Sequence, residues 1–344
     1  MVTEAQVLWV QKTLGVTRPA EPADGTTPAG GGAGDASGGG VFDDIKNFVV
    51  ELFTGEKAVK PADPVPRVEL GKAQTDRSDK LLAAMSKDDQ AKVGELLEKA
   101  KPEEKKYLQK ALASNHSAAE LDTFYKQIAG KDKAWMDVNL HVVGDSQGKG
   151  IKQQWECSCG PTTIQAMRGE LDPVYALKLR TDNPHLTEAK DDDATALNPN
   201  MAADQKAILV GHGGIATNRD TDGKGISLGG ALNEQKGVTG LKFDTEDVPD
   251  DKFDARLAEL DSALSGGLPV PIRVSSPGAT GGHFVLVVGG ELGPPRVYSI
   301  HDPWDGKIIK ASEADIKAKK LNIAGWTQIT HIYKPSADVP TVGS

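Results

Sequence analysis

The fold is decided by the stretch Gln153-Gln154-Trp155-Glu156-Cys157-Ser158-Cys159-Gly160-Pro161-Thr162-Thr163, which runs into a helical pattern from Ile164 to Arg168. Glycine and proline directly after Cys159 indicate a turn at which a helix begins. A thiol at the start of a helix lies at the positive end of the helix dipole, which favours the thiolate form. Cys159 is therefore the candidate nucleophile.

Two later segments contain the partners that a nucleophilic thiol needs. His283 stands at the head of an apolar run that ends at Gly289, and Asp302 ends a second run that begins at Arg296. Pro303 and Gly306 then indicate a turn. The chain between His283 and Asp302 is only long enough to run out and back, so two adjacent antiparallel strands can present these residues side by side. They are the candidate base and the candidate residue that orients it.

These segments together resemble the papain-like cysteine peptidases, specifically the branch similar to bacterial double-glycine leader peptidases. The matching motifs are Cys-Gly-Pro-Thr at 159–162, Gly-His-Phe-Val-Leu-Val-Val-Gly at 282–289 and Asp-Pro-Trp-Asp-Gly at 302–306, in the chain order of the family. In that branch a glutamine six positions before the nucleophile donates to the oxyanion. The resemblance therefore assigns this role to Gln153, with Gln154 as the competitor one position away.

The resemblance covers about residues 153–333, apart from an unmatched insertion at about 184–250. It implies an α+β papain-like fold, with a helical half and an antiparallel sheet. It also implies hydrolysis of a peptide bond in a protein or peptide substrate by a Cys-His-Asp triad through an acyl-enzyme, without a cofactor. Strands are expected at 269–274, 283–288, 297–300, 307–310 and 326–333, after a helix at 253–264.

Each assignment has a competitor. Cys157 competes as the nucleophile, and Cys159 could instead be a structural thiol; Cys159 is preferred because Gly160 follows it and a glutamine lies six residues before it. His301 cannot easily share a site with Asp302, because neighbouring strand residues point to opposite faces. His212 is interpreted as a plain loop histidine, and His331 is a further histidine in the same region.

Metal sites are matched poorly by the sequence. A zinc site made of Cys157, Cys159 and two histidines does not fit the usual ligand spacings. The segment Asn218–Gly223 resembles a calcium loop, but no glutamate closes it, so a solvated turn is expected. We expect no metal.

Composition excludes several classes of protein. The 344-residue chain has a net charge of −9, which argues against a nucleic-acid partner. No apolar run reaches the length of a membrane span, and the first residues lack a basic region followed by a hydrophobic core. A disulfide between Cys157 and Cys159 would be strained. The sequence therefore predicts synthesis in the cytoplasm without a signal peptide, with reduced thiols.

The chain before the candidate peptidase divides into three parts. Residues 1–40 predict a short helix followed by a flexible Gly/Pro/Ala-rich tether, and residues 41–77 an amphipathic helix and a linker. Residues 78–135 predict a module of three helices, with starts at Ser86, Pro102 and Ser117. Residues 136–338 form the predicted peptidase domain.

This organisation is more typical of a bacterial effector or toxin protease than of a leader-processing enzyme. Such a protein would be exported by a contact-dependent secretion system, and its partners would include a secretion apparatus or an immunity protein. Two alternatives stay open from the residues. One is a non-catalytic scaffold that binds peptides, and the other is a different thiol chemistry on amides, as in a deamidase, a transglutaminase or a cell-wall amidase.

Overall fold

The computed structural model describes residues 69–144, 150–155, 157–181, 199–216, 224–235 and 239–337. The helices expected at 3–14 and 41–54, the tether and the calcium-like segment lie outside these residues. The helices are α3 (Lys72–Ala84), α4 (Lys87–Lys99), α5 (Pro102–Ala113), α6 (Ala118–Ile128), α7 (Lys133–Asn139), α8 (Cys159–Leu171), α9 (Pro173–Thr181), α10 (Pro199–Gly211), α11 (Leu228–Glu234), α13 (Phe253–Ser265) and α14 (Glu313–Lys317), with a short 3-10 helix at Asp250–Lys252. The strands are β1 (Leu241–Asp247), β2 (Val270–Ser275), β3 (His283–Glu291), β4 (Val297–Asp302), β5 (Lys307–Ser312) and β6 (Gln328–Ala337).

Three of the first five described helices begin where the sequence predicted. The Ser86 side chain accepts a hydrogen bond from the backbone N–H of Asp89, and Pro102 occupies the first turn of α5. Ser117 and Glu120 form a reciprocal capping box at α6. These three starts agree with the sequence. The structure adds α3 and α7, which have no predicted counterpart because α3 has a weak apolar pattern and α7 is only seven residues long.

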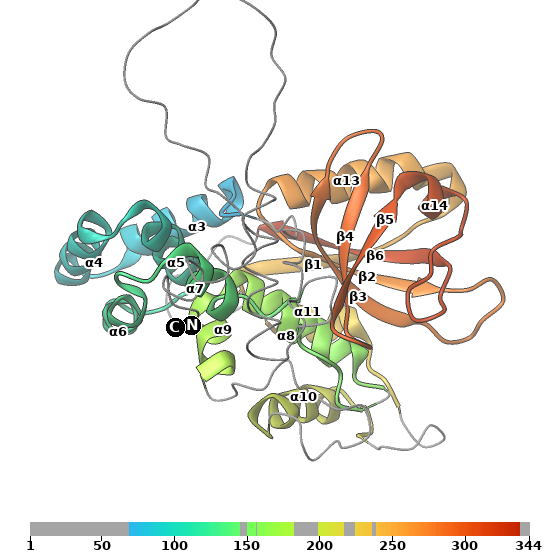
Figure 1. Ribbon diagram of the computed structural model, residues 1–344, viewed down its shortest axis with the longest axis horizontal. Coiled ribbons are helices and arrows are strands. Elements are labelled where there is room, and N and C mark those ends of the chain that lie inside the picture. The colour runs from blue at the N-terminus through green and yellow to red at the C-terminus, as the bar shows by residue number, and fades with distance from the viewer. Residues whose placement is uncertain are drawn as a thin grey trace, which may run out of the picture. The chain divides into compact units, whose positions relative to one another are not determined.

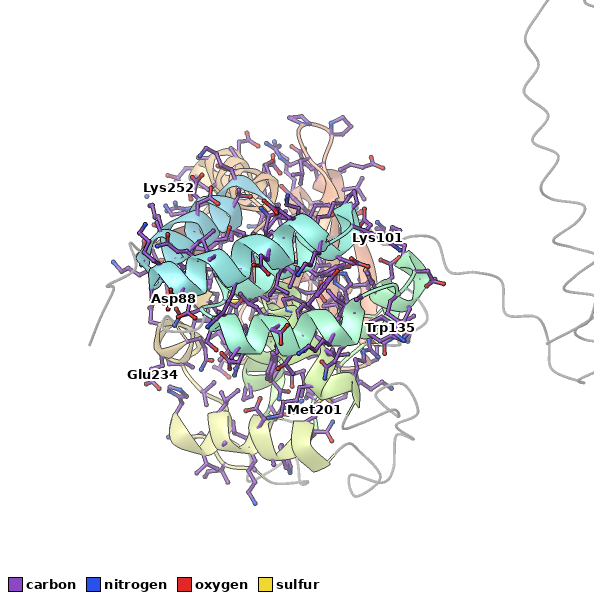
Figure 2. The ribbon with its side chains drawn as sticks, turned by 90° about the vertical axis from the view of Figure 1, so that its left-hand side faces the viewer. Asp88, Lys101, Trp135, Met201, Glu234 and Lys252 are labelled. Carbon is purple, nitrogen blue, oxygen red and sulfur yellow. The ribbon has the colours of Figure 1, made fainter. Side chains whose placement is uncertain are left out.

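The five helices share one apolar core. Leu108, Leu112, Leu121 and Phe124 are among its buried residues, and Leu177 of α9 belongs to the same cluster. Figure 2 views this side of the molecule, with Asp88 near the start of α4 and Lys101 directly before α5. Because Leu177 lies one helix after α8, this core is continuous with the part of the chain that carries Cys159.

The strands form one antiparallel sheet in the order β1-β6-β2-β3-β4-β5 (Figure 1). Five of them lie where the sequence predicted strands. The edge strand β1 has no predicted counterpart, because it falls within residues 184–250, the insertion that the resemblance does not match. It pairs with β6 from Leu241↔Ala337 to Asp247↔His331. The last part of that segment therefore belongs to the sheet rather than to an added loop.

Helices cover both faces of the sheet, which explains why the middle of β3 is apolar without alternation. Alternate β3 residues enter two separate cores. Leu286 and Val288 pack with α8 residues, including Ile164 and Met167. Val285 and Val287 pack with α13 residues, including Leu257 and Leu260. Figure 1 shows α13 and α8 on opposite sides of the strands. The chain is an α+β protein, as expected.

None of the helices in the described ranges combines the length and the apolar character that crossing a membrane requires.

Candidate active site

Cys159 is the first residue of α8. Its thiol is half-buried and forms no disulfide. The first turn of the helix is buried behind it, and the backbone N–H of Thr162 donates to the carbonyl oxygen of Ser158 at 2.9 Å. A Cβ atom at Gly160 would lie 3.1 Å from a side-chain carbon of Ile226 and 3.4 Å from one of Phe284. Glycine after the thiol thus lets α8 pack closely against Ile226.

His283 and Asp302 lie together at one end of the sheet. His283 is the first residue of β3 and Asp302 is the last residue of β4, and these two strands pair antiparallel. His283 Nε2 lies 2.6 Å from Asp302 Oδ1, and both residues are buried, with 4% and 2% of their surfaces exposed. The backbone N–H of Trp304 donates to the same Oδ1 at 2.9 Å. The carboxylate is therefore held in place on the Nε2 side of the ring.

Cys159 also acts on the imidazole of His283. Burial works to lower the pKa of His283, but the hydrogen bond to Asp302, the hydrogen bond to Cys159 and the charges of both partners raise this pKa to about 9. Asp302 engages Nε2, which leaves Nδ1 as the ring nitrogen that can serve Cys159.

Gln153 lies between the turn before Cys159 and the turn after Asp302. Its backbone N–H donates to the carbonyl oxygen of Pro303 at 2.8 Å, and its side-chain Nε2 donates to the carbonyl oxygen of Trp155 at 3.1 Å. Trp155 O also accepts from the N–H of Ser158, the residue before the candidate nucleophile. Gln153 therefore touches both segments that carry the other candidate residues.

Gln154 is oriented differently. It is buried, and its Nε2 donates to the carbonyl oxygen of Lys152 at 3.1 Å. Its backbone N–H lies 3.1 Å from Ser158 Oγ and 3.0 Å from Oε1 of Gln205, a residue of α10. Gln154 thus faces the helix of the insertion, whereas Gln153 faces the turns at 155–158 and 303.

Two residues at this site had not been identified from the sequence, Ser158 and Gln205. Ser158 is fully buried, and its hydroxyl accepts from the backbone N–H groups of Gln154 and Trp155. Gln205 is fully buried and binds the same loop. No motif marks Gln205, because it lies about fifty residues further along the chain in a helix that the resemblance did not cover.

The rival histidines are placed elsewhere. His301 is completely buried, and burial lowers its pKa to about 4. A Cβ atom at Gly150 would lie 2.8 Å from its Cε1 atom, so its ring packs against that backbone. His212 Nε2 lies 3.3 Å from Glu234 Oε2, and His331 Nε2 lies 3.1 Å from Asp247 Oδ1. His283 is the histidine whose pKa Cys159 raises.

Within the described ranges, no group of three or more histidine, cysteine, aspartate or glutamate side chains gathers in a way that could hold a metal ion. In comparisons with known proteins, no family model matches the chain and no curated protein matches it significantly.

Proposed function

We propose that this chain is a papain-like cysteine peptidase that hydrolyses peptide bonds through an acyl-enzyme. One observation carries the proposal. His283 Nε2 lies 2.6 Å from Asp302 at the end of β4, and Cys159 at the start of α8 helps to raise the pKa of the same imidazole. A nucleophile, a base and a residue that orients the base are the parts that thiol catalysis requires.

The acylation step uses the charged form of His283. The thiolate of Cys159 attacks the carbonyl carbon of the substrate, and the oxygen becomes an oxyanion. His283 Nδ1 then gives its proton to the amide nitrogen, the C–N bond breaks, and the amine leaves while a thioester forms on Cys159. A pKa of about 9 keeps His283 protonated at neutral pH, so this proton is available.

Deacylation reverses the direction of proton transfer. A water molecule attacks the thioester carbonyl, and His283 Nδ1 takes one of its protons. The C–S bond breaks, the carboxylic acid product leaves, and Cys159 is restored beside a protonated His283. Asp302 keeps Nε2 bonded throughout, so that Nδ1 stays directed at the reacting atoms.

The oxyanion needs donors that are placed before the reaction begins. We assign this role to the backbone N–H of Cys159, in the first turn of α8, and to the side-chain Nε2 of Gln153. Gln153 lies beside the turn that precedes Cys159 and is fixed through its backbone to Pro303, next to Asp302. Gln154 is disfavoured because it is buried and faces Lys152 and α10, away from Trp155 and Pro303, which Gln153 contacts.

The test is the appearance of new peptide ends. The purified chain is incubated with an unfolded protein mixture, and new N-termini are identified by mass spectrometry, with Cys159→Ala as the inactive variant and Cys157→Ala as the matched control. We expect cleavage by the unmodified chain and by Cys157→Ala, and none by Cys159→Ala. Proteolysis that persists in Cys159→Ala would refute the proposal.

A glutamine-containing peptide in the same reaction separates hydrolysis of the backbone from other amide chemistry. Deamidation adds about one dalton to an intact chain, whereas proteolysis divides it. A change of mass without a new terminus, dependent on Cys159, would replace peptidase by deamidase while leaving the catalytic triad in place.

A further inference from the structure

The side chain of Gln205 bonds to the backbone on both sides of Gln153. Gln205 Nε2 donates to the carbonyl oxygen of Lys152 at 3.0 Å, and Gln205 Oε1 accepts from the backbone N–H of Gln154 at 3.0 Å. The two bonds resemble one step of a strand ladder, with an amide side chain in place of a neighbouring strand. They fix the backbone direction of Gln153 without touching its side chain.

The same helix is anchored to α8. Asp204 Oδ2 accepts from Gln165 Nε2 at 2.7 Å and from the hydroxyl of Tyr175 at 2.6 Å. Gln165 also donates to the carbonyl oxygen of Met201, which is labelled in Figure 2. Neighbouring residues of α10 therefore bind the helix that begins with Cys159 and the loop that carries Gln153.

Gln205 is 0% exposed, and both its amide oxygen and its amide nitrogen bond to this loop. A buried amide whose oxygen and nitrogen both bond to one three-residue stretch acts as a spacer. Gln154 Nε2 and Ser158 Oγ bond to the same two backbone groups, so Gln205 belongs to a network that fixes this stretch. Its place in α10, outside the motifs of the site, means that the segment 199–211 contributes to the geometry of the loop at 152–154.

We propose that Gln205 is a positioning residue for catalysis, and that it holds the Lys152–Gln154 backbone so that the Gln153 amide meets the oxyanion. This inference rests on the proposed function and deepens it. It makes α10 part of the catalytic apparatus. An oxyanion donor must be placed to within a fraction of an ångström, and a misplacement of about 1 Å costs on the order of 10²-fold in rate.

The experiment compares Gln205→Met with Lys206→Met, an exposed neighbour on the same helix. Methionine has about the length of glutamine but can neither donate to Lys152 O nor accept strongly from Gln154 N–H. With a peptide substrate found by the cleavage assay, we expect kcat to fall about tenfold or more in Gln205→Met while KM changes less than about twofold. Lys206→Met should match the unmodified chain.

Two reagents distinguish a positioning role from general damage. Alkylation of Cys159 by iodoacetamide forms no oxyanion, so its rate should stay the same in Gln205→Met. A peptide aldehyde adds to the thiolate as a hemithioacetal, whose oxygen occupies the oxyanion position, so its affinity should fall by the same factor as kcat. Equal loss of alkylation and of aldehyde binding would mean a disturbed fold and would overturn the inference.

Gln205→Glu serves if Gln205→Met does not fold. A protonated carboxyl group can donate to Lys152 O and accept from Gln154 N–H, as the amide does, whereas the carboxylate cannot donate. Its kcat relative to the unmodified chain should therefore rise as the pH falls from about 8 to about 5. A ratio that does not change with pH would contradict the positioning role.

Failure of the inference is distinguishable from failure of the proposed function. If the unmodified chain cleaves peptides and Gln205→Met does so with the same kcat, only the role of Gln205 is overturned. If the unmodified chain shows no alkylation that depends on His283, both are overturned.

Discussion

Asp302 controls the charge of His283, and its substitution gives a prediction that does not require a known substrate. Asp302 Oδ1 accepts from His283 Nε2 at 2.6 Å and from the N–H of Trp304 at 2.9 Å. Asn at this position keeps an oxygen acceptor of the same shape but removes the negative charge. Ala removes both.

The magnitude follows from the kind of hydrogen bond that is lost. A bond to a charged group contributes about 1.5–3 kcal/mol and a neutral one about 0.5–1.5 kcal/mol. Asp302→Asn should therefore cost about 1 kcal/mol, which lowers the pKa of His283 by somewhat less than one pH unit from its value of about 9. Asp302→Ala should lower this pKa further, and should reduce kcat/KM about 10- to 150-fold.

The raised pKa of His283 also makes the free energy of unfolding depend on pH. The folded chain holds the His283 proton more tightly than the unfolded chain, whose pKa is about 6.5. The stabilisation from this group is therefore complete below pH 6.5, and it is lost as the pH rises through about 9. In Asp302→Asn this stabilisation should be lost at a lower pH.

The assay is an NMR titration of the histidine rings, in the unmodified chain and in both Asp302 variants, with His283→Ala to assign the resonance. We expect His283 to titrate near 9 in the unmodified chain, lower in Asp302→Asn and lowest in Asp302→Ala. Cys159→Ala should lower it as well, because Cys159 is the second partner that raises this pKa. Titration near 6.5 in the unmodified chain, or no change on substitution, would refute the reasoning.

Two further predictions concern stability. His301 has a pKa of about 4 because burial disfavours its charged form. As the pH falls, the unfolded chain therefore binds the His301 proton before the folded chain does. The free energy of unfolding should then fall by up to about 3 kcal/mol from pH 6.5 to 4. Urea unfolding of His301→Leu should show a smaller fall over this range, and an equal fall would be evidence against the assignment. In Gly169→Ala the new Cβ would lie 2.4 Å from a methyl carbon of Val142, so we expect a loss of about 1–3 kcal/mol despite the better helix propensity of alanine. Val142→Ala should partly rescue that variant in thermal unfolding, and strict additivity of the two losses would contradict the clash.

The parts of the fold that the sequence predicted are those with a local signal. Ser86, Pro102 and Ser117 mark helix starts because each makes a bond, or lacks a donor, within its own first turn. The strands that carry His283 and Asp302 were predicted from short apolar runs, and their antiparallel pairing from the length of chain between them. That His283 serves Cys159 is expected from chain order and resemblance, and it stays a prediction; Cys159 is among the groups that raise the pKa of His283.

The parts that were missed depend on contacts between distant segments. The edge strand β1 has only one covered face and alternates in burial, and its partner β6 lies about ninety residues further along the chain. Gln205 is an ordinary helical glutamine until α10 packs beside the loop at 152–154. A motif search cannot find such a residue, since its role lies in the backbone that it binds.

Several expectations stay predictions. The domain boundaries, the export route, the immunity or secretion partner and the role as a bacterial effector are not tested by any contact in the described residues. The assignment of Gln153 to the oxyanion also stays a proposal, although its place beside the turns at 155–158 and 303 supports it.

The most direct test of the central claim is the reactivity of Cys159. The unmodified chain and His283→Ala are treated with iodoacetamide at neutral pH, and the modified residue is mapped by mass spectrometry, with Cys157 as the internal reference. The arrangement of Cys159, His283 and Asp302 predicts fast labelling of Cys159 that slows markedly in His283→Ala, with Cys157 unaffected. Slow labelling that is equal in both proteins, or confined to Cys157, would contradict the claim and leave a scaffold without an activated thiol.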